Sequence, residues 1–306
     1  MFDLDDTIVQ HGSYVAPRVV EALKAARKAG FSLSIASGRP LCIVGKEVLQ
    51  DGLMDYAVCS NGADVSCLAT GERLSRRLLL REEALLCYKL LEDFKPAWNA
   101  FFDGKAFFEW KGTSYLLTGR TGALARQARQ SSEDRALAYR FASMAYKGAR
   151  YVMRVAAGGN SRQVFSLLPH LSRAYAGVEK MGCSIPDAQR CAEAVELLRS
   201  EGYYEVVTMG PTEIEVTARG VTKGSGAKEL MDALGIDRAH TVAFGDGGND
   251  LALCDAVGRF VAMGNADDDV KDASFEVCPS VAEDGVAVWI ENMLAFGGLE
   301  EGVRYV

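Results

Sequence analysis

The sequence is poor in the residues that build metal centres from histidine or cysteine. It has three histidines, none near another along the chain, and eight cysteines without a CxxC pair. In a chain of 306 residues, scattered cysteines indicate reduced and mostly buried thiols rather than a disulfide framework or a zinc site. We therefore expect a cytoplasmic protein.

Long apolar runs and an excess of positive charge are also missing. No apolar stretch reaches the ~18 residues of a membrane span, and residues 1–6 contain neither the basic nor the apolar region of a secretory signal. Acidic residues number 41 and basic residues 34, for a formal net charge of -7. Proteins that bind the phosphate backbone of nucleic acid usually present a basic face, so we expect no nucleic acid as partner. Because no apolar stretch is long enough for a span, we expect no membrane either.

The composition itself is that of a folded globular protein. Hydrophobic residues make up 49% of the chain and charged residues 25%, which allows a sizeable core. At about 100–200 residues per domain, the length predicts two domains.

Both ends of the chain alternate helix and strand patterns. Near the N-terminus a helix begins at Pro17 and ends at Gly30, and the next elements are a strand at 31–36, an amphipathic stretch at 41–49 and a strand at 56–60. The rhythm resumes with a helix ending at Leu234, a strand at 241–244, a helix at 251–256 and a strand at 259–262. This alternation predicts an α/β fold with a Rossmann-like parallel sheet covered by helices.

The middle of the chain has a different pattern. It predicts a helix at 81–94, a hairpin at 99–109 turning at Asp103-Gly104, a strand at 151–157, a helix at 186–201, and an antiparallel strand pair at 203–209 and 213–217. Paired strands with helices indicate an α+β unit. We predict a core domain of residues 1–80 and 218–306, interrupted by an inserted domain of residues 81–217.

Two acidic segments follow predicted strands. Asp3 and Asp5 come at the end of an N-terminal strand, where alternation would aim both carboxylates in similar directions and demand a cation or a shared proton. Asp246, Asn249 and Asp250 follow the strand at 241–244 and offer the hard oxygen ligands that suit Mg²⁺. Taken singly, the first segment also fits an acidic surface turn, and the second fits a glycine-rich turn capped by Asp250.

Two further segments could hold a phosphate. Ser37-Gly38-Arg39 lies between a strand and a helix, where a hydroxyl and helix-start amides can bind an anion, although a plain N-cap serine fits as well. Lys223 lies in the glycine-containing segment 220–224, and by itself it could be a solvated lysine. Together the four segments predict metal-assisted phosphoryl chemistry, in which a carboxylate can attack phosphorus.

The ordered set DxDDT, SGR, TKG and GDGGND resembles the four motifs of the haloacid dehalogenase superfamily of phosphotransferases. Residues 60–63, 262–266 and 283–286 resemble signatures of its Cof-type phosphatase branch. The long segment between Ser37 and Lys223 corresponds to the C2 cap of that family, and its paired strands resemble the B subtype. Two departures are visible: Asp6 replaces a frequent glycine, and Ser37 replaces the threonine common in this branch.

The resemblance implies a role for each motif residue. Asp3 would be the nucleophile that forms an aspartyl-phosphate, and Asp5 the general acid and base. Mg²⁺ would be held by the Asp3 carboxylate, the Asp5 main-chain carbonyl and Asp246, with support from Asp250. The phosphoryl oxygens would be bound by Ser37, Gly38, Lys223 and Asn249, with Arg39 as a weaker candidate at the cap interface.

The resulting expectation is a Mg²⁺-dependent phosphatase that hydrolyses a small phosphorylated metabolite. Sugar phosphates are the leading substrates, ahead of phosphorylated cofactors such as pyridoxal phosphate or flavin mononucleotide, and the oligomeric state is left open. The alternatives are a phosphosugar mutase of the same superfamily, a receiver-type signalling module and a non-catalytic phospho-ligand binding protein. The DxD spacing and the large insertion argue against the receiver module.

The N-terminus carries a separate expectation. Only Met1 and Phe2 precede Asp3, whereas a typical strand has about 5–6 residues. A strand this short would leave backbone groups unpaired and an apolar groove open beside it. We therefore expect the natural protein to start a few residues upstream, with an apolar strand-forming segment.

Overall fold

The structure is a computed structural model that describes residues 1–10, 14–49, 52–109 and 160–299. The chain divides into a core unit, Met1–Leu78 with Thr217–Val306, and an inserted unit, Leu79–Val216. The predicted boundaries, 1–80 with 218–306 and 81–217, lie close to these. The strand expected at 151–157 lies outside the described residues.

The sheet of the core unit has two parts on either side of the N-terminal segment. One part has the order β1 (Ser34–Ala36), β2 (Tyr56–Cys59), β3 (Asp64–Cys67) and β4 (Arg73–Arg76), and the other has the order β11 (Val242–Gly245), β12 (Arg259–Ala262) and β13 (Glu276–Val277). Phe2 forms parallel bridges to both Ile35 and Phe244, so the segment that carries Asp3 lies centrally. Strands β3 and β4 are antiparallel to their neighbours and form one edge.

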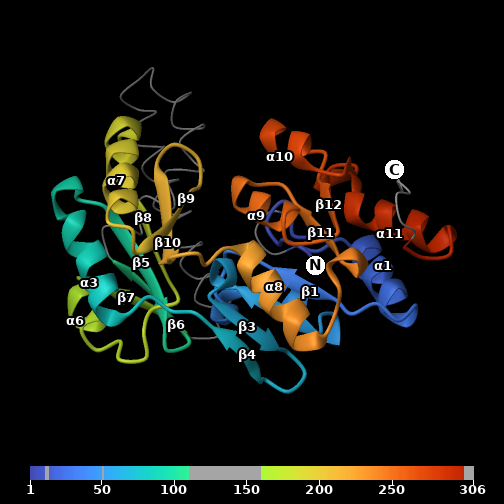
Figure 1. Cartoon of the computed structure of the whole chain (residues 1–306), viewed down its shortest axis with the longest axis horizontal. Helices are drawn as coiled ribbons and strands as arrows, with labels where there is room; N and C mark the ends of the chain where they lie inside the picture. Colours follow the sequence, from blue (N-terminus) through green and yellow to red (C-terminus); the bar gives the residue numbers. More distant parts are fainter. Residues whose placement is uncertain (11–13, 50–51, 110–159, 300–306) are drawn as a thin grey trace, which may run out of the picture. The chain divides into compact units, whose positions relative to one another are not determined.

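Helices cover both faces of this sheet (Figure 1). On one face, α1 (Pro17–Lys28) and α11 (Gly285–Ala295) share a hydrophobic cluster with Phe2, Ile35 and Phe244. On the other face, α8 (Lys223–Leu234) and α9 (Leu251–Cys254) contribute to a second cluster with Val58 and Phe260. This confirms the predicted α/β fold.

Short helices complete the core unit. They are η1 (Leu41–Ile43), α2 (Lys46–Leu49), η3 (Ser60–Gly62), η5 (Arg238–His240), η6 (Gly248–Asp250), α10 (Asp268–Ala273) and η7 (Val281–Glu283). The stretch at 41–49, which has a helical pattern, is therefore two short pieces separated by Val44 and Gly45. The strand expected at 31–36 is also shorter, because only Ser34–Ala36 pairs with β2.

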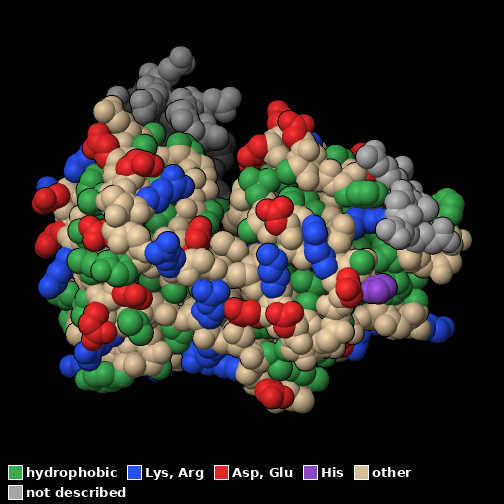
Figure 2. All heavy atoms as spheres, viewed as in Figure 1, with side chains coloured by type: hydrophobic (Ala, Val, Ile, Leu, Met, Phe, Trp, Pro, Cys, Tyr) green, Lys and Arg blue, Asp and Glu red, His purple; other side chains and the backbone are tan. Residues whose placement is uncertain are grey.

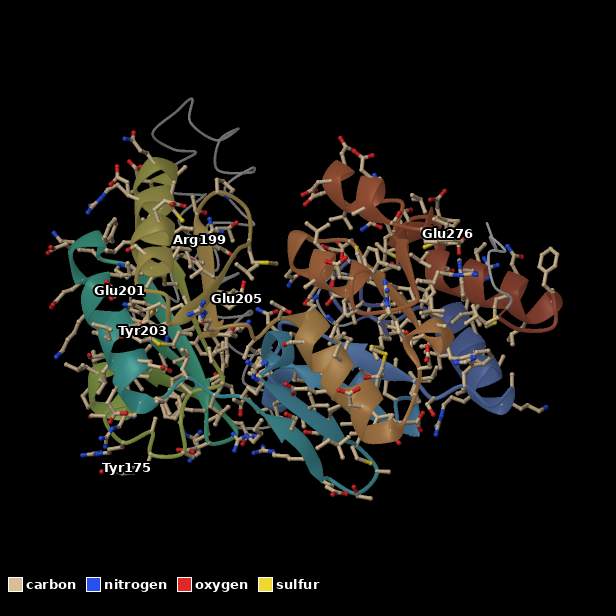
Figure 3. All side chains as sticks on the ribbon, in the orientation of Figure 1. Tyr175, Arg199, Glu201, Tyr203, Glu205 and Glu276 are labelled. Atoms are coloured by element: carbon tan, nitrogen blue, oxygen red, sulfur yellow. The ribbon has the colours of Figure 1, made fainter. Side chains whose placement is uncertain are left out.

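Aromatic stacking and one buried carboxylate organise the centre of the core unit. Phe2 stacks on Phe244 with ring centroids 5.2 Å apart, and Phe244 meets Trp289 edge-on at 5.1 Å. The buried carboxylate is that of Glu276, which is labelled in Figure 3. It accepts a hydrogen bond from the Trp289 indole N–H at 2.7 Å, and Arg259 forms an ion pair with it at 3.8 Å. The buried indole N–H and the Glu276 carboxylate therefore have polar partners, as is usual for buried polar groups.

A cavity of about 310 Å³ lies at the amino ends of β1 and β11. Its mainly apolar lining includes Met1, Leu33 and Trp289. The Met1 amine donates to the Val242 carbonyl at 2.7 Å, and burial lowers the pKa of this amine to about 5. The hypothesis of an upstream strand segment is not tested by this geometry and stays a prediction.

The inserted unit is an α+β sandwich of one sheet and a helical layer (Figure 1). The sheet order is β7 (Ser161–Val164), β6 (Lys105–Glu109), β5 (Ala97–Phe102), β8 (Lys180–Ser184), β10 (Glu213–Ala218) and β9 (Tyr204–Thr208). Among the residues of this unit that the structure describes, the helices are α3 (Arg81–Leu90), η4 (Glu92–Phe94), α6 (Leu168–Leu171) and α7 (Ala188–Ser200). The β5–β6 turn has positive φ at Asp103 and Gly104, as the hairpin prediction requires.

Charged side chains of both signs are interspersed over the visible face of each unit (Figure 2). Within the part of the chain that the structure describes, no helix is long and apolar enough to cross a membrane.

Candidate active site

The predicted site residues of the core unit gather at the carboxyl ends of its parallel strands. Asp3 follows the Phe2 bridge, Ser37 follows β1 and Asp246 follows β11. Lys223 is the first residue of α8, where the Thr222 side chain accepts a hydrogen bond from Ser225 N and caps the helix. Loops at this edge of a parallel sheet are the usual place for a ligand.

Lys223 joins two of the predicted carboxylates. Its ammonium donates to Asp3 Oδ1 at 2.7 Å and to Asp250 Oδ1 at 2.6 Å, and the residue is 1% exposed. Burial by itself lowers the pKa of Lys223, but the carboxylates of Asp250 and Asp3 outweigh it and raise the pKa above its ordinary value. The lysine therefore stays a fixed positive charge inside the site.

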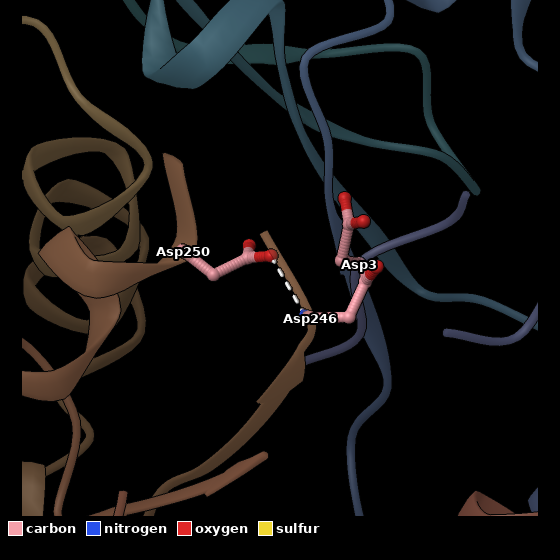
Figure 4. Close-up of side chains that lie close together, drawn as sticks. All are labelled: Asp3, Asp246 and Asp250. Atoms are coloured by element: carbon pink, nitrogen blue, oxygen red, sulfur yellow. Dashed lines mark hydrogen bonds between the residues drawn. The ribbon is translucent and has the colours of Figure 1, made fainter. Parts of the chain in front are cut away.

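Three carboxylates lie close together in the site, those of Asp3, Asp246 and Asp250 (Figure 4). One oxygen each of Asp3, Asp246 and Asp250 lies within 4.8 Å of the others. Asp250 is held in place because its Oδ2 accepts from the backbone N–H groups of Asp246 and Gly247, both at 3.1 Å. A Cβ on Gly245 would lie 2.4 Å from Asp250 Cγ, so only glycine at 245 leaves room for this carboxylate.

The electrostatics of the three carboxylates favour a bound cation. Burial, with a contribution from Asp250, raises the pKa of Asp3 to about 8 although Lys223 acts against the shift. Burial and the nearby Asp250 raise the pKa of Asp246 to about 7. A divalent ion would relieve this unfavourable crowding of negative charge, and carboxylate oxygens are the ligands that Mg²⁺ prefers. The donor set thus fits the metal that the sequence predicted.

Asp5, the predicted acid and base, lies next to this cluster in sequence but has a different partner. Arg39 holds its carboxylate with two hydrogen bonds, from Nε at 2.8 Å and from Nη2 at 2.5 Å. The Asp5 side chain is 42% exposed and that of Arg39 is 20% exposed. The sequence suggested Arg39 only as a weaker phosphate-site candidate, and nothing in the sequence pattern pairs it with Asp5.

The remaining phosphate-site candidates lie on two loops. Ser37 is buried, and its hydroxyl oxygen accepts from Arg39 N at 3.1 Å, which orders the loop that contains Gly38. Asn249 is half-buried in the η6 turn, between Gly248 and Asp250. Both loops thus belong to the same edge of the core sheet as Asp3.

Two supporting residues were not recognised from the sequence. The Thr7 hydroxyl donates to Asp246 Oδ1 at 3.1 Å and so orients a predicted metal ligand. Asn265 donates from Nδ2 to the Asp6 carbonyl at 2.8 Å and accepts from Val281 N at 2.8 Å, which fixes the loop after Asp5. Both lie in quoted motifs, DxDDT and residues 262–266, but their partners are distant in sequence.

Asp6, which departs from the family pattern, has a φ of 57°. This left-handed conformation is easy for glycine and costs free energy for other residues. The geometry gives the physical reason why glycine is frequent at this position.

Comparison with known proteins identifies the family of the chain. The profile of the haloacid dehalogenase-like hydrolases matches residues 1–290. The chain is 27% identical over 296 residues to the 5-amino-6-(5-phospho-D-ribitylamino)uracil phosphatase YwtE of Bacillus subtilis, covering 96% of each protein. It is 26% identical over 292 residues to the pyridoxal phosphate phosphatase YbhA of Escherichia coli, covering 95% of this chain and 97% of that protein.

Solved structures give the same result. The structure of the haloacid dehalogenase subclass IIB sugar phosphatase BT4131 matches with a TM-score of 0.71 and 25% identity, covering 97% of both chains. A haloacid dehalogenase-like hydrolase from B. subtilis matches with a TM-score of 0.77 at 20% identity, covering 95% of this chain and 98% of that chain, which shows the shared fold. The chain therefore belongs to the haloacid dehalogenase-like hydrolases, in the Cof-type phosphatase branch that its motifs predicted.

Proposed function

We propose that this phosphatase is Mg²⁺-dependent, that it hydrolyses small phosphate monoesters through an aspartyl-phosphate on Asp3, and that sugar phosphates are its main substrates. The observation that carries the proposal is the buried contact of Lys223 with Asp3 and Asp250, beside Asp246. A fixed ammonium next to a nucleophilic carboxylate and a cation-binding cluster suits a dianionic phosphoryl group.

The metal would be held by the carboxylates of Asp3 and Asp246 and the main-chain carbonyl of Asp5, with Asp250 supporting the metal side. When bound, Mg²⁺ would neutralise phosphate charge and stabilise the charge that develops during transfer. The Thr7 hydroxyl orients Asp246, and the N–H groups of 246 and 247 orient Asp250. The acidic cluster is thus ordered by the chain's own groups.

In the first chemical step, an oxygen of Asp3 attacks phosphorus and the ester P–O bond breaks. The leaving oxygen takes the electron pair and receives a proton from the Asp5 carboxyl. In the second step, Asp5 accepts a proton from a water whose oxygen attacks phosphorus, the bond to Asp3 breaks, and inorganic phosphate leaves. Asp5 has to leave its ion pair with Arg39 before it can exchange protons with a substrate.

The transferring phosphoryl group would be bound by the Ser37 hydroxyl, the Gly38 amide, the Lys223 ammonium and the Asn249 amide. These groups supply hydrogen bonds and charge from loops of the core unit, and such groups contribute most when they are ordered before the substrate arrives. Ser37 and Lys223 meet that condition, because both are buried and hydrogen-bonded.

The proposed partner is a small phosphorylated metabolite. The named relatives act, by their names, on a ribitylaminouracil phosphate, on pyridoxal phosphate and on sugar phosphates. These compounds differ in the organic group and share the phosphate monoester, which supports a common core reaction. None of the eight cysteines, all of which lie in the described part of the chain, forms a disulfide, which favours a reducing compartment such as the cytoplasm.

The deciding experiment measures phosphate release from a panel of phosphate monoesters with Mg²⁺. We expect wild type to release phosphate and Asp3→Asn to be inactive while it remains folded, because no other group takes over the attack. Asp55→Asn is the control, since Asp55 binds Arg27 and Leu33 N at the amino end of β2, away from the site. Wild-type turnover in Asp3→Asn would disprove the mechanism.

A phosphosugar mutase would give a different result in the same assay. It would convert a sugar phosphate into its isomer when supplied with a bisphosphate activator and would release little free phosphate. A non-catalytic binding protein would give neither product.

For the metal, Asp246→Ala should raise the Mg²⁺ concentration needed for half-maximal activity by orders of magnitude, because it removes an oxygen ligand. Lys223→Ala should instead impair phosphate binding and turnover at any Mg²⁺ concentration. Equal shifts of the Mg²⁺ requirement in both variants would contradict this division of roles.

A further inference from the structure

The turn η3, residues Ser60–Gly62 at the carboxyl end of β2, has an unusual backbone. Three consecutive residues have positive φ: 52° at Ser60, 55° at Asn61 and 98° at Gly62. Ser60 is 0% exposed and Asn61 is 2% exposed. Non-glycine residues in this region cost conformational free energy and persist where the surrounding structure holds them. The contacts of the turn with its surroundings must therefore hold it in this conformation.

One contact of the turn is with the loop that contains Ser37. The backbone N–H of Ser60 donates to the Arg39 carbonyl at 3.0 Å, and the N–H of Asn61 donates to the Ser37 carbonyl at 3.1 Å. Ser37 N in turn donates to the Val58 carbonyl at 2.8 Å. The loop is thus attached to β2 and the turn on both sides of Gly38. Its position follows the backbone conformation of residues 60 and 61.

The other contact is with the start of α8. A Cβ on Gly62 would lie 2.2 Å from the Thr222 carbonyl oxygen and 3.2 Å from Gly226 N. Reciprocally, a Cβ on Gly226 would lie 2.7 Å from Gly62 Cα and 2.6 Å from a Val58 methyl. Thr222 caps the helix whose first residue is Lys223. The close approach of Gly62 and Gly226 therefore determines the position of the start of α8, and with it that of Lys223.

We propose that the Ser60–Gly62 turn is a positioning element that fixes the Ser37 hydroxyl and the Lys223 ammonium relative to each other, and so sets the geometry of the phosphoryl pocket. The two groups are far apart in sequence, and the same strained turn contacts the segments that carry both of them. The inference rests on the proposed function, because it takes Ser37 and Lys223 as phosphate-binding groups. Ser60, Asn61 and Gly62 themselves have no catalytic role in it.

The test compares Gly62→Ala with Gly30→Ala. Gly30 lies in the same unit after α1, has a nearly equal φ of 96°, and has no atom within 4 Å of an added Cβ. Both variants force an L-residue into the same backbone region, but only the methyl at 62 displaces the start of α8. The control therefore subtracts the backbone cost, and the remaining difference reports the contact with Thr222.

The measurements are the melting temperature, the dissociation constant of inorganic phosphate with Mg²⁺ by calorimetry, and KM and kcat with p-nitrophenyl phosphate. Both variants should have a lower melting temperature than wild type. Gly62→Ala should bind phosphate about tenfold or more weakly and raise KM, since small misplacements at such sites cost one to two orders of magnitude. Gly30→Ala should stay within about twofold of wild type in phosphate affinity, as expected for sites that do not couple.

Equal phosphate affinities in the two variants would overturn the proposal. If Gly62→Ala does not fold, Gly226→Ala decides, because it disturbs the same contact from the helix side while alanine improves helix propensity. Unchanged phosphate affinity in a folded Gly226→Ala variant would overturn the proposal. Failure of both Gly62→Ala and Gly226→Ala to fold would also overturn it, because the turn would then be needed for folding alone. A wild-type protein that binds phosphate but hydrolyses no ester would instead disprove the proposed function, and the phosphate affinities would still test the turn.

Discussion

Replacing Lys223 by methionine removes the positive charge at the centre of the site while keeping most of the side-chain volume. The ammonium lies 2.7 Å from Asp3 Oδ1 and 2.6 Å from Asp250 Oδ1 in surroundings that leave the lysine 1% exposed. Removing one partner of a buried ion pair leaves an uncompensated charge and costs about 3–5 kcal/mol. Against a typical stability of about 5–15 kcal/mol, Lys223→Met should be strongly destabilised.

The assay is urea unfolding in EDTA, so that no metal ion compensates for the lost ammonium. Lys180→Met is the matched control, because Lys180 is also buried and paired, with Glu215 in the inserted unit. Both variants should lose stability, Lys223→Met more because it leaves two carboxylates without their cation. Phosphate affinity should fall only in Lys223→Met.

A double variant separates charge from packing. Adding Asp250→Asn to Lys223→Met removes a buried carboxylate that has lost its cation and should recover part of the lost stability. A loss of less than about 1 kcal/mol of unfolding free energy in Lys223→Met would refute the reasoning, because that is the range of an exposed ion pair. A double variant less stable than Lys223→Met would refute it as well.

Three further predictions concern the same unit. In the metal-free protein the pKa of Asp3 is raised from 3.8 to about 8 and that of Asp246 to about 7, so the stability that these groups contribute is present below pH 3.8 and is lost as the pH rises through 7 and 8. Because Mg²⁺ binds the ionised carboxylates, it should raise the melting temperature more at pH 8 than at pH 5. An equal rise at the two pH values would contradict this reasoning. Asp6→Gly should stabilise the protein by about 0.5–1 kcal/mol in urea unfolding, because φ is 57° there, and a loss of stability would show that the aspartate side chain is needed. An apolar strand-forming segment added before Met1 should raise the unfolding free energy by about 0.5–2 kcal/mol by filling the cavity of about 310 Å³, whereas a Gly/Ser segment of equal length should not.

Local sequence patterns were sufficient for several elements of both units. The helix that begins at Pro17, the strand at 259–262 and the turn at Asp103-Gly104 depend on neighbouring residues, and all three are found as predicted. Elements whose ends depend on distant partners were less well predicted. The strand at 31–36 is shortened to the residues that pair with β2, and the amphipathic stretch at 41–49 is divided by Val44 and Gly45.

The sequence by itself determined the family and the set of groups available for chemistry, because motifs such as DxDDT and GDGGND place carboxylates directly after strands. What those groups contact was decided by the tertiary structure alone. The partners of Asp5, Asp246 and Asp3 are Arg39, Thr7 and Lys223, and each pair joins segments that are distant along the chain. Periodicity and turn chemistry act over a few residues, whereas these contacts exist only once the strands of the core sheet are side by side.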